Sequence, residues 1–241
     1  MSTYQIEFIT PLFSRGSYDD LPEIRPASIR GQLHWWFRAL AGKYLDEKLI
    51  FGGVHGGASA SKIVVRVSDL PKRIEPAAWL PTLPHKPGGH NPRNAPNAPR
   101  CALPAGENFK LIVLERLGGL TTDQRRQFDR TIQTWLMAGS LGLRATRGGG
   151  SIHWSQAPPD EAGFRARLSE LLNEAPLGFD ILGRVFPTAE DARKVTTETI
   201  AHQAFKDIHY PLGAVRQGFQ DSAPSRKTSP LRLTVRRFLD G

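Results

Sequence analysis

Residues 22–53 read PEIRPASIRGQLHWWFRALAGKYLDEKLIFGG, and this stretch carries most of the fold prediction. Pro22 and Pro26 disfavour a helix that starts earlier in the chain. Ser28 then offers a hydroxyl that can cap a helix beginning at Ile29. Apolar residues recur from there at helical spacing: Ile29, Leu33, Trp36 and Leu40. The pattern predicts an amphipathic helix with a capped first turn.

The same helix is expected to carry a cationic row beside its apolar stripe. That row consists of Arg30, His34 and Arg38, because residues four apart lie on one side of a helix. Gly42 indicates the end of the helix, although residues 45–49 could extend it. Consecutive tryptophans cannot point the same way, so Trp36 is expected in the core. For Trp35 two alternatives remain open: a surface position without a ligand, or stacking on a base.

The elements around this helix predict an α+β fold. Alternating or β-branched stretches predict four strands, at residues 4–8, 61–67, 109–115 and 151–154. A second helix is expected over residues 121–137, ending at Gly139. The order β-α-β-β-α-β is that of a ferredoxin-like, RRM-like domain. We therefore predict such a domain over residues 1–156.

Two further regions elaborate this domain. Residues 71–106 are rich in proline and glycine and predict an extended arm that cannot build a core of its own. Residues 157–241 are expected to pack on the first domain, with helices near 160–174 and 188–206. The alternating residues 231–239, LRLTVRRFL, predict a basic terminal strand.

Charge favours a polyanionic partner. The chain has 32 Lys and Arg against 23 Asp and Glu, a formal net charge of +9, and a surplus of this kind favours nucleic acid over a membrane. No apolar run is long enough to span a bilayer and no secretion signal is visible, so we expect a cytoplasmic protein. The single cysteine excludes an internal disulfide and a cysteine-rich zinc site. No cofactor or metal is expected.

A second glycine-rich stretch, GLRATRGGGS, covers residues 142–151. Glycines let backbone amides approach phosphate oxygens, and Arg144 and Arg147 supply forked donors. The stretch matches neither the Walker loop nor the dinucleotide-binding pattern. An ordinary flexible connection is the alternative interpretation, but the basic charge of the chain favours phosphate binding.

These motifs together resemble the RAMP superfamily of CRISPR-associated proteins, in particular the Cmr-type first subunit of type III-B effector complexes. The resemblance rests on PEIRPASIRGQL, WWFRAL and IFG in the opening stretch, on GLRATRGGGS, and on SRKTSPLRLTV near the end. It implies an RNA-recognition module that assembles with sister subunits around a guide RNA in antiviral defence. It also implies contact near the 3′ end of the guide and its target RNA, without catalysis by this subunit.

This sequence departs from the family pattern in two places. His34 stands where a basic residue usually precedes the tryptophans, which would make one contact dependent on pH. The chain is also shorter than the usual two-domain member. From the motifs and the resemblance together, the expected RNA-binding residues are Arg25, Ser28, Ile29, Arg30, Gly31, His34, Arg38, Gly52, Gly53, Arg144, Arg147, Gly148, Arg226 and Lys227. Recognition is expected to be of backbone, 2′-hydroxyls and duplex shape rather than base identity.

Other functions remain open from the sequence. Sister subunits of the superfamily cut RNA with an acid in the loop before the opening helix, where Asp19 and Asp20 stand and could hold Mg²⁺. A metal-free cleavage using His209 and Tyr210 is a weaker alternative. A scaffold without RNA contact, relying on the proline-rich arm to touch neighbouring subunits, is the third.

Overall fold

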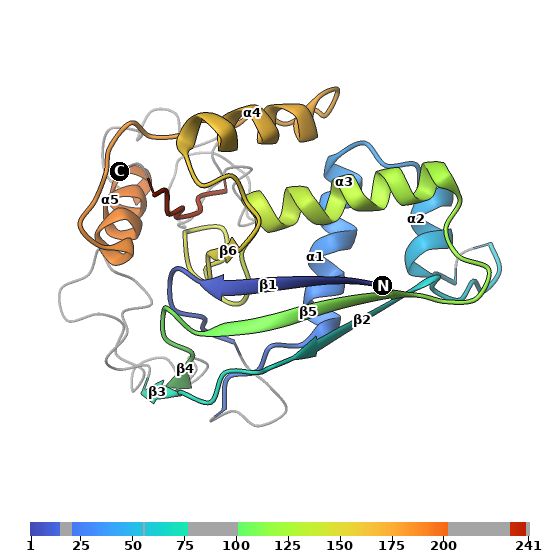
Figure 1. The fold of residues 1–241 in the computed structure, drawn as a ribbon, viewed down its shortest axis with the longest axis horizontal. Helices are drawn as coiled ribbons and strands as arrows, with labels where there is room; N and C mark the ends of the chain where they lie inside the picture. The colour runs from blue at the N-terminus through green and yellow to red at the C-terminus, as the bar shows by residue number, and fades with distance from the viewer. Residues whose placement is uncertain (15–20, 55, 77–100, 202–231, 240–241) are drawn as a thin grey trace, which may run out of the picture.

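The fold is built on a four-stranded antiparallel sheet, seen here in a computed structural model that describes residues 1–14, 21–54, 56–76, 101–201 and 232–239 (Figure 1). The strands are β1 (Ser2–Phe8), β2 (Ile63–Ser68), β5 (Asn108–Glu115) and β6 (Ile152–Trp154). Their order across the sheet is β2-β5-β1-β6. With one helical crossover after β1 and another after β5, this is the ferredoxin-like arrangement, so the predicted fold class is confirmed.

Helices α1 (Pro26–Ala39) and α3 (Thr122–Ala138) pack on the same face of the sheet. A short helix, α2 (Tyr44–Phe51), follows α1 and returns the chain toward β2. Thr121 caps α3 in a reciprocal pair with Gln124, which satisfies two amides of the first turn. Helices α1 and α3 begin and end within a few residues of the predicted positions. Residues 45–49, a possible extension of the first helix in the sequence, belong to the separate helix α2.

The core follows from the period-two alternation of the strands. Ile6 pairs with Phe109 across β1 and β5, and both side chains are buried beneath the helices. The rings of Phe8 and Phe109 stack with their centroids 5.5 Å apart. The helices contribute their apolar stripes: Ile29, Leu33 and Trp36 from α1, as predicted, together with Phe37, and Phe128, Ile132 and Trp135 from α3. The predicted Leu40 is also buried but belongs to a second cluster. Each such side chain stabilises the fold by about 1.5–3 kcal/mol.

The start of α1 corrects one prediction. Its N-cap is Arg25, in extended conformation and without a side-chain cap, and Pro26 occupies the first turn. The expected cap at Ser28 is therefore wrong, because proline with its fixed φ already suits the first helical position and moves the start of the helix toward the N-terminus.

The end of α1 is a Schellman turn. The amide of Gly42 donates to the carbonyl of Phe37 (2.9 Å), and the amide of Ala41 donates to that of Arg38 (3.0 Å). Ala41 takes the left-handed conformation, with φ of 60°, a position usually filled by glycine. Gly42 is needed for a different reason, since a Cβ there would lie 2.2 Å from Cε1 of Phe37.

The base of the proline-rich arm is part of the fold. Strands β3 (Glu75–Pro76) and β4 (Cys101–Ala102) form a two-stranded sheet apart from the main one (Figure 1). Leu103 pairs with Leu12 and is buried, so the arm is anchored to the core at this point. Residues 77–100 lie outside the described residues.

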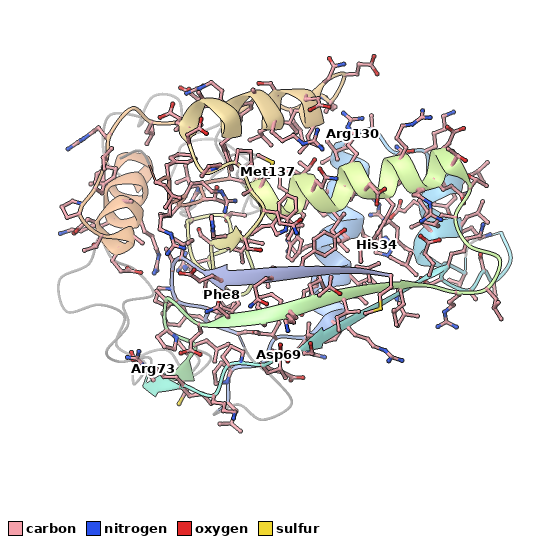
Figure 2. All side chains as sticks on the ribbon, in the orientation of Figure 1. Phe8, His34, Asp69, Arg73, Arg130 and Met137 are labelled. Atoms are coloured by element: carbon pink, nitrogen blue, oxygen red, sulfur yellow. The ribbon has the colours of Figure 1, made fainter. Side chains whose placement is uncertain are left out.

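Two helices and a terminal segment complete the chain. Helix α4 (Glu161–Leu172) packs on α3, and Arg130 of α3 donates to the carbonyls of Leu171 and Asn173 (Figure 2). Helix α5 (Ala189–Ala201) lies at the β6 end of the sheet.

The described terminal residues 232–239 form no regular strand, which corrects the prediction of one. Within them only Leu233 makes a bridge, parallel to Arg147. Most of the remaining bonds use side chains: the amide of Val235 donates to Oγ of Ser151 (3.0 Å), and the guanidinium of Arg236 donates to the carbonyls of Ile152 and Gly139. The amide of Leu239 donates to the carbonyl of Pro159 (2.9 Å). These bonds replace a ladder along the edge strand β6.

We predict opposite effects for two neighbouring substitutions at the end of α1. Ala41→Gly should stabilise the fold by about 0.5–1 kcal/mol because it removes the left-handed penalty. Gly42→Ala should destabilise it by about 1–3 kcal/mol because of the overlap with Phe37. Thermal unfolding should show the former raising and the latter lowering the melting temperature, by about 2–4 °C per kcal/mol. Equal shifts of the same sign would contradict this description of the turn.

Candidate nucleic-acid interface

The first turn of α1 is open to solvent. Ala27, Ser28 and Gly31 are exposed, and the turn contains no acidic residue. A Cβ at Gly31 would meet nothing within 4 Å among the described residues, although glycine inside a helix costs about 1 kcal/mol relative to alanine. The positive end of the helix dipole is therefore accessible to an anion. The amides of Ser28 and Ile29, however, both donate to the carbonyl of Arg25.

The cationic row is turned toward α2. Nδ1 of His34 lies 2.7 Å from Oε1 of Glu47, and Nε of Arg38 donates to both carboxylate oxygens of Glu47 at 2.8 and 2.9 Å. The His34 ring also packs on Phe51, with centroids 4.3 Å apart, between α1 and α2 (Figure 2). Arg30 donates to the carbonyl of Phe51. The three residues thus share one side of the helix, as their spacing predicted.

Glu47 is the residue that sequence reasoning missed. It is 4% exposed and lies on the inward side of α2 with Ile50 and Phe51. Burial alone would raise its pKa, but the hydrogen bonds from Arg38 and His34 outweigh burial and hold the pKa below its usual value. The signal available in the sequence was its spacing from Ile50 and Phe51, three and four residues on.

Arg38 remains the most accessible cation of the row. Its side chain is 67% exposed although it pairs with Glu47.

Gly52 and Gly53, after α2, have structural roles. Gly52 has φ of 82° and ends the helix through a bond to Lys48, and Gly53 pairs with Ser59.

The backbone amides of the glycine-rich loop donate hydrogen bonds to other parts of the chain and to the loop itself. The amides of Gly148, Gly149 and Gly150 donate to the carbonyls of Leu233, Arg144 and Pro11, at 2.9, 3.0 and 3.0 Å. A Cβ at Gly150 would lie 2.0 Å from the carbonyl oxygen of Leu141. These glycines therefore serve the close packing of the loop, and its arginines are the groups it offers to a ligand.

Arginines gather around this loop. Arg144 is exposed, whereas Arg147 is half-buried and its Nη1 has no hydrogen-bond partner among the described residues. Burial, and then the charge of Arg144, lower the pKa of Arg147. Burial also lowers the pKa of Arg232 and of Arg236. Such desolvated cations create a positive potential that a nearby anion would relieve.

Arg193 adds a further cation beneath the loop. It is buried and pairs with Glu190 at 3.1 Å, and its aliphatic part lies against Gly148. Its guanidinium lies over the ring of Phe13, 5.9 Å from the centroid. Helix α5 is thereby attached to the glycine-rich loop.

The terminal segment brings α1 and the glycine-rich loop together. Arg232 lies over the ring of Trp35, with its guanidinium carbon 3.7 Å from the ring centroid. The next residue, Leu233, pairs with Arg147. Trp35 is 38% exposed, whereas Trp36 is 5% exposed and belongs to the core, as expected. We refer to Trp35, Arg144, Arg147 and Arg232 as the arginine–tryptophan surface.

The remaining predicted site residues divide into two groups. Arg25 is exposed at the start of α1. Asp19, Asp20, His209, Tyr210, Arg226 and Lys227 lie outside the described residues. Within the described ranges, no group of three His, Cys, Asp or Glu could hold a metal ion. The helices in those ranges are also too short or too polar to cross a membrane.

We predict that Glu47→Gln destabilises the protein in a pH-dependent way. The folded-state pKa of Glu47 is lowered, so its contribution is present above the unfolded pKa of about 4.3 and disappears as pH falls through the folded value. At pH 7 the substitution should cost about 1.5–3 kcal/mol, the usual range for hydrogen bonds to a charged group. Urea unfolding at several pH values between 7 and 3.5 should show the gap to the parent closing at the acid end.

Glu170→Gln is the matched control, because Glu170 is 70% exposed and pairs with Arg167 less than one turn away on the same helix. It should change the free energy of unfolding by less than about 0.5 kcal/mol at any of these pH values. A gap for Glu47→Gln that stays constant with pH would show that the ionised carboxylate is not what joins α1 to α2.

Known proteins are similar to this chain in sequence and in fold. The model of the RAMP superfamily matches residues 5–153. The CRISPR system Cmr subunit Cmr1-2 of Pyrococcus furiosus is 40% identical over 80 residues, covering 29% of this chain and 41% of that protein. The Cmr subunit Cmr1-1 of the same organism is 30% identical over 228 residues, covering 86% of this chain and 62% of that protein. This chain therefore spans less than two thirds of the length of either relative.

The crystal structure of Cmr1 from Pyrococcus furiosus in its apo form has the same fold. It superposes with a TM-score of 0.60 over 92% of this chain and 79% of that one, at 16% identity. The family model covers more than half of the chain and includes both the cationic helix and the glycine-rich loop. The chain belongs to the RAMP superfamily.

Proposed function

We propose that this chain is a non-catalytic, RNA-binding subunit of a type III CRISPR effector complex, gripping the backbone of guide and target RNA. The observation that carries the proposal is the arginine–tryptophan surface. There Arg147 and Arg232 are partly desolvated, and Arg144 adds a further charge. A polyanion would offset the desolvation of Arg147 and Arg232 and the repulsion between Arg144 and Arg147.

The accessible groups favour recognition of phosphate rather than of base edges. The paired N–H donors of arginine match the oxygens of a phosphate. The open first turn of α1, within the opening sequence motif, provides a second position that attracts anions. Such contacts hold any RNA sequence equally, as a subunit that must accept many guides requires. Contact near the 3′ end of the guide is part of this proposal and rests on the resemblance.

The proposed partners are the guide RNA, the target RNA and the other subunits of the complex. Support comes from the two Cmr subunits that this chain resembles, although it spans only part of each. The exposed apolar residues of α2, Tyr44, Leu45 and Leu49, offer a surface where another subunit could pack.

Replacing Arg144 and Arg147 together by alanine should weaken binding to unrelated RNA sequences about equally. The slope of log K against log salt should fall by roughly 0.7–0.9 for each phosphate interaction that the substitutions remove. Fluorescence anisotropy with two labelled RNAs of unrelated sequence, measured across a salt series, tests this.

Arg116 and Arg126 provide the control pair, because both are exposed near the start of α3, at the opposite end of that helix from the glycine-rich loop. Their double alanine variant should keep the parent slope. Equal slopes for both double variants, with unchanged melting temperatures, would refute the assignment of phosphate contacts to this loop.

The absence of catalysis is tested separately with Asp19 and Asp20. A reconstituted complex carrying Asp19→Ala and Asp20→Ala should cut target RNA at the same positions and rates as the parent complex. Disappearance of one cleavage product, with assembly intact by gel filtration, would instead make this subunit an endoribonuclease.

A further inference from the structure

Trp35 is held in a fixed orientation at the surface. Its ring packs perpendicular to that of Trp36, with centroids 4.9 Å apart and an interplanar angle of 90°. Trp36 is itself 5% exposed and fixed in the core. A pre-oriented aromatic ring loses little conformational entropy when a ligand packs on it.

Arg232 is fixed over that ring from a distant part of the chain. The neighbouring Leu233 is held on both sides of its peptide unit, accepting from the amide of Gly148 at 2.9 Å and donating to the carbonyl of Thr146 at 3.3 Å. The guanidinium carbon then lies 3.7 Å from the Trp35 centroid. This spacing is that of a stacked cation–π pair.

The positive charge of the stacked Arg232 is not balanced by a carboxylate of the described residues. Burial lowers the pKa of Arg232, and no carboxylate of the described residues counteracts this effect. Arg147, beside Leu233, has a buried Nη1 without a hydrogen-bond partner in the same part of the chain. Arg147 therefore provides a second cation on the segment that pairs with the residue after Arg232.

A planar group linked to a phosphate matches both features. Nucleotide bases stack on tryptophan rings and on arginine planes, whereas their phosphates accept hydrogen bonds from guanidinium groups. In a continuous duplex both faces of each base are covered by its neighbours, so the ligand has to be an unpaired or terminal base.

We propose that Trp35 and Arg232 form a stacking platform for one unpaired RNA base, whose adjacent phosphate contacts Arg147. This proposal rests on the proposed RNA-binding function and deepens it, because it specifies single-stranded RNA at this position. The contact is independent of base identity, since every base offers a π face.

Binding of an oligouridylate and of an abasic ribose-phosphate oligomer of the same length tests the platform. The parent chain should prefer the oligouridylate. Trp35→Leu should weaken its binding by about 5- to 150-fold, the range expected when one base–aromatic stack is removed, and should leave abasic binding unchanged. Trp35→Phe should retain most of the preference. Melting temperatures of all variants should stay near that of the parent, because Trp35 is not part of the main apolar core.

Arg232→Lys separates stacking from charge. Lysine keeps the positive charge but lacks the planar group, so the preference for the oligouridylate should fall while the salt slope stays the same. The Arg144→Ala, Arg147→Ala variant should behave in the opposite way, with a lower slope and an unchanged preference.

The outcomes distinguish this inference from the function on which it rests. If Trp35→Leu weakens both oligomers equally or neither, the platform is refuted while RNA binding stands. If the parent chain binds neither oligomer nor a longer RNA at low salt, both proposals are refuted.

Discussion

The burial of one face of α1 against the sheet determines where the candidate ligand-binding groups of this helix lie. Ile29, Leu33 and Phe37 are fully buried and cannot leave the sheet without exposing a large apolar area. At 3.6 residues per turn, this fixes the directions of all other side chains on the helix. The cations at intervals of four must then lie beside α2, and Trp35 must lie toward solvent. The sheet therefore orients the groups of this helix through packing.

Much of the fold was accessible from the sequence because its signals are local. Strand alternation, the apolar spacing of α1 and the Thr121 cap of α3 each depend on neighbours within a few residues. The start of α1 was misplaced because two local signals competed, and the proline at position 26 prevailed over the hydroxyl of Ser28. Sequence rules for helix starts do not decide between a proline and a capping hydroxyl when both fall within one turn.

The site was less predictable because its decisive contacts join distant segments. The burial of Glu47 depends on how α2 folds back on α1, which a helical pattern does not specify. In the loop at residues 142–151, glycines suggested free amides, but Pro11 and Leu233 supply carbonyls that take them up. The basic terminal residues looked like a strand, yet hydroxyl and guanidinium groups make most of their bonds to the edge of the sheet. In each case the missing information was the identity of a long-range partner.

The pairing of Leu233 with Arg147 also affects how stably the terminal segment is attached to the rest of the domain. Trp35 and Arg232 stand almost at opposite ends of the sequence, so their contact closes a very long loop. The entropy of that closure must be offset by a few backbone and side-chain bonds and by the packing of Val235 and Phe238. The sheet and its helices have a large apolar core that does not depend on this closure. The terminal segment is thus expected to open and close as a small cooperative unit of its own, with a stability lower than that of the domain. Ligand-binding groups lie on both sides of this contact. A ligand that binds to both sides therefore stabilises the closed form by its binding free energy.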